Sequence, residues 1–213
     1  MSQPTNEIIH IEAKPKSITI EPTKSAVLVI DMQNDFGSKG GMFDCAGLDI
    51  SMIQATVRPT SKVLVAARHA GIPIVYLKMG FRPDLSDLGT SDSPNRTRHL
   101  HFGVGQTMSA PDGTEGRFLV RDTWNTDVIS ELKPETEDRI VYKHRFSGFF
   151  ETELDNVLRR CGTKYLIVTQ RASVLNRRSG TPCSGITPVC SWLTVWESLL
   201  AVIFREATMR LRF

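Results

Sequence analysis

Short apolar runs alternate with longer amphipathic segments along most of the chain. The run "SAVLVID", Ser25 to Asp31, is bounded by polar residues, a pattern typical of a central strand buried on both faces. Ile72 to Lys78, Arg139 to Lys143 and Lys164 to Thr169 have the same character. The pattern therefore predicts four buried strands.

Two segments between these strands have helical periodicity. Val57 to Ala70 carries apolar residues at helical spacing and is followed by Gly71, a residue favoured just after a helix. In "ETELDNVLRRCG" the apolar positions Leu154 and Leu158 precede Gly162 in the same way. Strands separated by helices predict a mainly parallel sheet with helices on both faces. In such sheets, ligands bind at the carboxyl ends of the strands.

A long polar stretch separates the second predicted strand from the third. From Phe81 to about Gly116 the chain is rich in Ser, Asp, Gly, Pro and Arg, and we predict a loop there. A loop of this length inside a compact domain is usually functional or disordered. Substrate specificity is expected in "GFRPDLSDLG" and the loop that follows it.

Composition narrows the class of protein. With 213 residues and 40% hydrophobic content, residues 1–213 can form one domain with a sizeable core. The net charge is only +3 and its basic residues are scattered, so nucleic acid is not an expected partner. A membrane span and a signal peptide are not expected either. The four cysteines show no CxxC spacing, which favours free thiols in the cytoplasm.

Two of the predicted strands end in charged residues. Asp31 closes the first strand in "VIDMQNDF", and Lys143 closes the third in "VYKHRFSGFF". Each alone is more often a helix cap or a solvated strand end. The carboxyl ends of parallel strands meet at one edge of the sheet, so the two side chains are expected within about 4–6 Å of each other.

Other chemically active side chains have ordinary structural explanations. His99 and His101 could bind a metal, but no Cys or carboxylate at ligand spacing completes a site, and a polar loop pair is the preferred interpretation. Cys45 and Cys161 are predicted to be small buried residues. Four aromatic residues flank the two charged motifs and could line a pocket or pack the core: Phe36, Phe43, Phe149 and Phe150.

The strand-end motifs resemble a known family. "AVLVIDMQNDF", the pair Gly40–Gly41, and "KHRFSGFFETELDNVLRRCG" followed by "YLIVT" are similar to the isochorismatase-like cysteine hydrolases, and most to the ureidoacrylate and biuret amidohydrolase branch. The resemblance runs from about residue 18 to residue 169 and implies a three-layer α/β/α sandwich. It implies a small amide or ureido substrate and an Asp-Lys-Cys catalytic set, in which Asp31 matches the general base and Lys143 the lysine. No metal or other cofactor is implied, and a homo-oligomer is left open.

The expected nucleophile is missing. The family's cysteine should follow the fourth strand, near residue 176, where this chain has Asn176. However, "LNRRSGTPCSGIT", Leu175 to Thr187, can be encoded by codons that read "VESTVRDAMFRDY" one base earlier, which is the family's own helix. The same shift turns the residues just before Leu175 into "TTSVC" and continues to Ala201. We interpret residues 170–213 as an out-of-frame tail; a genuinely divergent tail is the alternative.

This interpretation leaves two classes of function. The chain is a cysteine amidohydrolase by descent, or it is an inactive remnant that could bind a partner. A nucleotide-binding Rossmann domain is disfavoured because "GVGQT" lacks the strand and helix that flank a phosphate loop. Cys183 and Cys190 are not expected to act as nucleophiles. Within the tail, Ser191 to Phe204 has apolar residues at close to helical spacing and predicts a helix.

Overall fold

A five-stranded sheet forms the centre of the fold. The computed structural model describes residues 8–13, 16–170 and 201–204. The strand order is β7 (Arg139–Lys143), β4 (Ile74–Met79), β3 (Ser25–Ile30), β8 (Tyr165–Gln170) and β9 (Ala201–Phe204). The first four are parallel, and β9 pairs antiparallel with β8. The mainly parallel sheet and its four predicted strands are confirmed.

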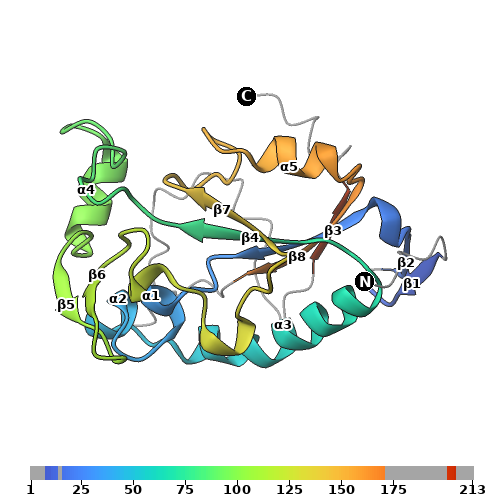
Figure 1. Ribbon diagram of the computed structural model, residues 1–213, viewed down its shortest axis with the longest axis horizontal. Helices are drawn as coiled ribbons and strands as arrows, with labels where there is room; N and C mark the ends of the chain where they lie inside the picture. Colours follow the sequence, from blue (N-terminus) through green and yellow to red (C-terminus); the bar gives the residue numbers. More distant parts are fainter. Residues whose placement is uncertain (1–7, 14–15, 171–200, 205–213) are drawn as a thin grey trace.

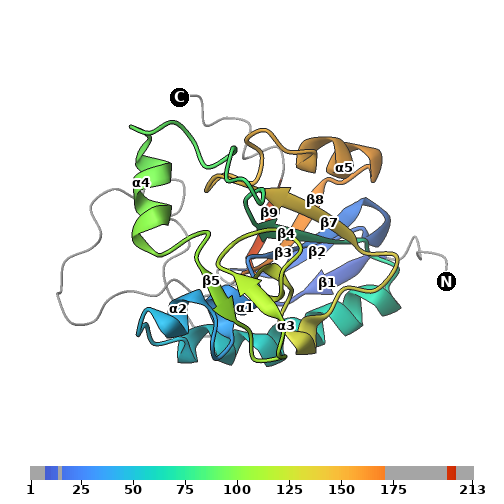
Figure 2. The same ribbon diagram turned by 60° about the vertical axis from the view of Figure 1, so that its left-hand side comes forward.

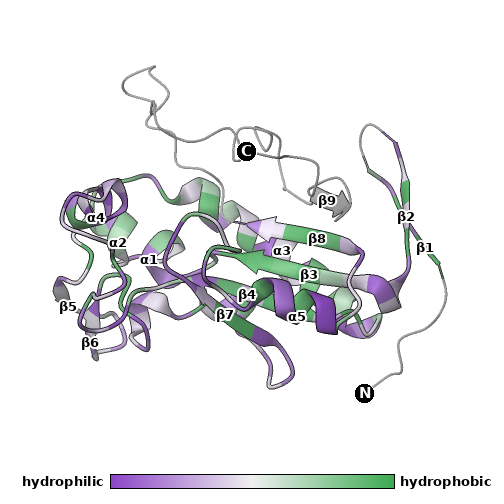
Figure 3. Ribbon diagram, turned by 90° about the horizontal axis from the view of Figure 1, so that it is seen from above, coloured by the Kyte–Doolittle hydropathy of each residue, from purple (hydrophilic) through white to green (hydrophobic). Residues whose placement is uncertain are grey.

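Helices cover both faces of this sheet. Helix α3 (Ser51–His69) lies below it in Figure 1, and helix α5 (Leu154–Arg160) lies above it. Leu64 of α3 belongs to one buried cluster with Val27 and Val29 of β3. Leu154 and Leu158 of α5 belong to another, with Ala26 and Leu28 of the same strand. Alternate positions of one strand thus enter two separate cores, as expected for a parallel strand covered on both sides. The hydropathy colouring in Figure 3 shows the apolar character of β3, β4 and β8.

The remaining elements are short, and most of them lie at the carboxyl ends of the parallel strands. At the strand ends lie α1 (Asn34–Gly37), α2 (Met42–Cys45), α4 (Pro94–His101) and a hairpin of β5 (Thr107–Ser109) and β6 (Glu115–Arg117), which Figure 2 shows together. A second hairpin joins β1 (Ile9–Ile11) to β2 (Ile18–Ile20). Short 3-10 helices occupy Pro22–Lys24, Trp124–Thr126 and Ser130–Leu132.

The prediction of a long loop between Phe81 and Gly116 was wrong. This segment contains helix α4 and strand β5, and β6 begins at Glu115. The sequence of this helix has no apolar periodicity, because the helix is short and strongly polar and its buried residue is His99. Its start is nevertheless marked by Pro94 at the first helical position, where the missing N–H costs nothing.

Two further boundaries differ from the prediction. Helix α3 begins at Ser51 rather than Val57, and Pro59 lies inside it. Proline cannot donate to the carbonyl four residues before it, so the helix contains Pro59 at the cost of one hydrogen bond. In the tail, Ala201–Phe204 is a strand and not part of a helix. The rest of the predicted helix, like the other tail residues from 171 onward, lies outside the described residues.

None of the helices in the described part of the chain combines the length and apolar character that crossing a membrane requires.

Candidate active site

Asp31 and Lys143 meet at the carboxyl edge of the sheet. Lys143 ends β7 and Asp31 follows β3, so the end of β4 lies between their strands. The Lys143 ammonium donates a hydrogen bond to Asp31 Oδ2 over 3.1 Å, and both residues are buried, with 3% and 8% of their surface exposed. The separation agrees with the distance expected from the sequence. A buried carboxylate beside a buried ammonium can accept a proton while the ammonium stabilises developing negative charge.

The backbone at Asp31 makes this meeting possible. Continued alternation along β3 would place Asp31 on the face of Val27 and Val29, whereas Lys143 shares the opposite face with Val141. Asp31 instead has a φ of 56°, in the left-handed region that few non-glycine residues adopt. Its N–H still donates to the Leu77 carbonyl at 3.0 Å. The strand's alternation therefore ends at Asp31, and such strain is characteristic of functional positions.

The side chain of Gln33 connects the segment after β3 to the end of β4. Its side chain is fully buried; its Nε2 donates to the Met79 carbonyl at 2.8 Å and to the Thr126 carbonyl at 3.2 Å. Its Oε1 accepts from the Met79 N–H at 2.7 Å. The amide thus pairs with Met79 as a further strand residue would. Sequence reasoning missed this role, because Gln33 is one of several polar residues in "DMQNDF" and its partners are distant in the sequence.

Asp35 anchors the loop that follows Asp31. Its fully buried carboxylate accepts hydrogen bonds from Asn125 Nδ2 and the Leu119 N–H, both at 2.6 Å, and from the Met42 N–H at 3.0 Å. Burial raises the pKa of Asp35 to about 6, although these hydrogen bonds favour the charged form. Asp35 therefore fastens α1 to α2 and to the segment before Asn125.

His99 is a buried residue of helix α4, so the interpretation of His99 and His101 as a polar loop pair was wrong. Its ring packs 5.0 Å from Phe81 and 5.7 Å from Phe146, measured between ring centroids. The Nδ1–H donates to the Asn95 carbonyl over 2.7 Å, since a carbonyl can only accept. Burial lowers the pKa of His99, and the positive charge of Lys143 lowers it further. Among the described residues there is no group of three or more His, Cys, Asp or Glu that could hold a metal ion.

Of the aromatic residues and cysteines considered in the sequence analysis, some lie in the core and others on the surface. Phe36 and Phe43 are buried and pack edge-to-face, so they belong to the core. Phe149 and Phe150 are half exposed on the loop after β7. The prediction that Cys45 is buried was wrong, because this thiol is exposed next to the Gly40 carbonyl.

Cys161 is partly buried at the end of α5. Because α5 leads back to the start of β8, Cys161 lies at the opposite end of the strands from Asp31.

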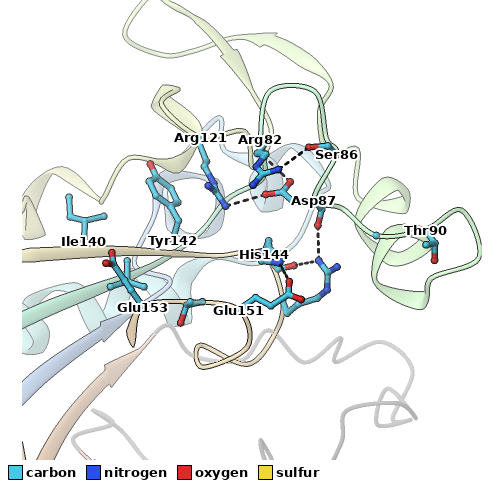
Figure 4. A pocket seen from close by; sticks show the side chains of 14 residues that line it. Arg82, Ser86, Asp87, Thr90, Arg121, Ile140, Tyr142, His144, Glu151 and Glu153 are labelled. Carbon is cyan, nitrogen blue, oxygen red and sulfur yellow. Dashed lines mark hydrogen bonds and ion pairs between the residues drawn. The ribbon is translucent and has the colours of Figure 1, made fainter. Parts of the chain in front are cut away.

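A cavity opens along the outer side of β7. It has a volume of about 820 Å³, and its lining includes His144 and Arg145, the two residues after Lys143. Figure 4 shows Ile140 and Glu153 at one end, Tyr142 and His144 in the middle, and Arg82 with Asp87 beyond them. Its wall is formed by Arg82, Ser86, Asp87, Gly89, Thr90, Arg121, Ile140, Val141, Tyr142, His144, Arg145, Glu151, Thr152 and Glu153. We call it the β7 cavity.

Comparison with known proteins identifies relatives. The family model for the isochorismatase domain matches residues 25–169. The ureidoacrylate amidohydrolase RutB of Rhizobium rhizogenes is 36% identical over 78% of this chain and 66% of that protein. RutB of Agrobacterium fabrum is 38% identical over 74% of this chain and 68% of that protein. This chain thus matches only about two thirds of the length of these relatives.

Solved structures agree with the sequence relatives. A cysteine hydrolase from Pseudomonas syringae pv. phaseolicola has a TM-score of 0.58 and 32% identity, covering 81% of this chain and 66% of that chain. An isochorismatase family protein from Desulfovibrio vulgaris has a TM-score of 0.53 and 28% identity, covering 69% of this chain and 66% of that chain. Residues 25–169, which the family model matches, contain β3, β4, β7, nearly all of β8, and the Asp31–Lys143 pair.

Proposed function

The chain belongs to the isochorismatase family, and we propose that it descends from a cysteine amidohydrolase that cleaves small amide or ureido compounds. The buried Asp31–Lys143 ion pair, with 3.1 Å between its charged atoms, is the observation that carries this proposal. The ureidoacrylate amidohydrolases among its relatives support the substrate class. We further propose that the chain as written is inactive, because its residues after about Thr169 are read out of frame.

In the ancestral reaction, Asp31 accepts the proton of a cysteine thiol. The thiolate attacks the amide or ureido carbonyl carbon, and Lys143 stabilises the negative charge of the site. The carbon–nitrogen bond then breaks, and the amine or ammonia leaves with a proton while a thioester remains on the cysteine. Water hydrolyses the thioester and restores the thiol. The present chain retains the base and the lysine for this sequence of steps.

The nucleotide sequence around codon 169 provides the first test. We expect that reading one base earlier between codons 170 and 201 yields the "TTSVC" and "VESTVRDAMFRDY" segments. Codons whose other frame does not spell a family sequence would exclude the frameshift and leave a divergent tail.

Activity provides the second test, with release of ammonia or amine from small ureides as the measurement. The chain as written is expected to show no enzymatic turnover, and Cys183→Ala and Cys190→Ala should change nothing. A chain carrying the restored frame is expected to hydrolyse a ureide. On that background Asp31→Asn should reduce the rate by about 100-fold or more, the range for loss of a general base. Turnover by the chain as written that Cys190→Ala abolishes would contradict the proposal, as would an inactive but folded restored chain.

A further inference from the structure

The β7 cavity is large enough to hold a small organic ligand. Its volume of about 820 Å³ lies within the range of sites for small organic molecules. Neither Asp31 nor Lys143 lines it, although His144 and Arg145 of its wall follow Lys143 directly. The cavity therefore has its own set of contacts, and its occupant does not depend on the amidohydrolase activity proposed above.

Three guanidinium groups line one end of the cavity, and they are not equally neutralised. Arg121 forms an ion pair with Asp87 Oδ2 at 3.1 Å and donates to the Gly80 carbonyl. Arg145 donates from Nη1 to the carbonyls of Asp87 and His144, both at 2.7 Å, and so has neutral partners in these bonds. Arg82 is exposed and donates to the Ser86 hydroxyl over 3.5 Å.

The carboxylates of the wall are either already engaged or distant from these guanidinium groups. The Asp87 carboxylate accepts hydrogen bonds from the main-chain N–H of Arg82 and from the Arg121 guanidinium. The Arg121 guanidinium therefore neutralises the charge of Asp87. Glu151 accepts a hydrogen bond from His144 Nε2 at 3.1 Å, and its side chain is 65% exposed to solvent, which screens a charge that only a protonated imidazole would neutralise. Glu153 lies at the other end of the cavity, beside Ile140 (Figure 4). The end near Arg82 and Arg145 therefore attracts an anion, while Glu153 repels a second negative charge.

An apolar surface lies between the two ends. Ile140 is 44% exposed on the edge strand β7, and the ring of Tyr142 lies between it and the arginines (Figure 4). Arg121 Cζ lies 5.0 Å and Lys78 Nζ 4.8 Å from the centroid of this ring, so Ile140 provides most of the free apolar surface. A bare inorganic anion would leave this surface unused. A carbon chain extending from a carboxylate would cover it, and the planar fork of a guanidinium matches the two oxygens of a carboxylate.

We propose that the β7 cavity binds a small organic monocarboxylate, with its carboxylate against the guanidinium groups of Arg82 and Arg145 and its carbon chain along Tyr142 and Ile140.

The test is a binding measurement on the full chain with sodium butyrate, by calorimetry or by ligand-observed NMR. Butyramide has the same shape without the charge, glutarate adds a second carboxylate, and inorganic phosphate lacks the carbon chain. Butyrate is expected to bind most tightly of the four, and more weakly as salt is added. Butyrate that does not bind, or binds no better than butyramide, overturns the proposal. Tighter binding of phosphate than of butyrate overturns its organic part, and tighter binding of glutarate overturns the assigned role of Glu153.

Substitutions locate the site. Arg82→Gln and Arg145→Gln are each expected to weaken butyrate binding about tenfold, the scale of one hydrogen bond to a charged group. Arg159→Gln removes the same charge from the exposed face of α5, outside the cavity, and should leave the affinity unchanged. Arg145 also holds two loops together, so its variant could lose stability. Arg82 has no such role, and unchanged affinity in a folded Arg82→Gln chain would refute the assignment.

Discussion

Replacing Lys143 with methionine should destabilise the fold far more than replacing a lysine on the surface. Lys143 and Asp31 are buried, with side-chain exposures of 4% and 11%, and their charged atoms are 3.1 Å apart. At an effective dielectric constant of about 20, their attraction amounts to roughly 5 kcal/mol, against which the cost of desolvating both charges must be set. Removing the ammonium leaves that cost on Asp31 without the attraction.

The expected loss for Lys143→Met is about 3–5 kcal/mol in the free energy of unfolding, the range observed when one partner of a buried pair is removed. For a chain of this size the melting temperature should fall by roughly 10 °C. Urea unfolding followed by circular dichroism measures the change. Lys24→Met is the matched control, because Lys24 pairs with Glu21 over 2.6 Å on the surface and should contribute little.

A double-mutant cycle then separates the pair from its surroundings. Asp31→Asn removes the charge from the carboxylate, and the double variant should lose less stability than the sum of the two single losses. Additive losses, or a Lys143→Met loss no larger than that of Lys24→Met, would show that the two charges are not coupled. The active-site assignment would then lose its structural basis.

Three other substitutions, the last with a control, test the groups around the pair. The pKa of Asp35 is raised from 3.8 to about 6 in the folded chain. The free energy of unfolding should therefore fall by roughly 3 kcal/mol as pH rises from about 4 to 6. In the Asp35→Asn chain, urea unfolding should show no such fall. Stability that rises over that interval relative to the variant would contradict this. Gln33→Leu leaves three buried main-chain groups unpaired and should cost about 3 kcal/mol or more, measured in the same way. Gly41→Ala places a Cβ 2.1 Å from the Asn34 carbonyl oxygen and should lower the melting temperature, whereas Gly47→Ala meets no atom within 4 Å and should have a smaller effect, due to its positive φ alone.

The strands and the charged pair could be predicted because local sequence determines them. A run such as "SAVLVID" must bury both faces, and parallel pairing brings Asp31 and Lys143 to one edge without any knowledge of their side-chain contacts. Helix α4 and the groups that fix Asp31 could not be predicted in the same way. Gln33 and Asp35 are polar residues in a polar motif, and their burial depends on Met79, Leu119 and other residues that are distant in the sequence.

The structure around the charged pair is determined by residues that precede the tail. The hydrogen bonds that hold the loop after β3 come from Met79, Leu119, Asn125 and their neighbours, and the Lys143 strand is paired with β4. A change of reading frame after Thr169 would therefore remove the nucleophile and leave these contacts in place. Under the proposed frameshift, this division would explain how the chain keeps the Asp31–Lys143 pair while the residues after Thr169 lie outside the family match. If the proposal is right, restoring the frame should supply a cysteine to a site whose other half is already folded.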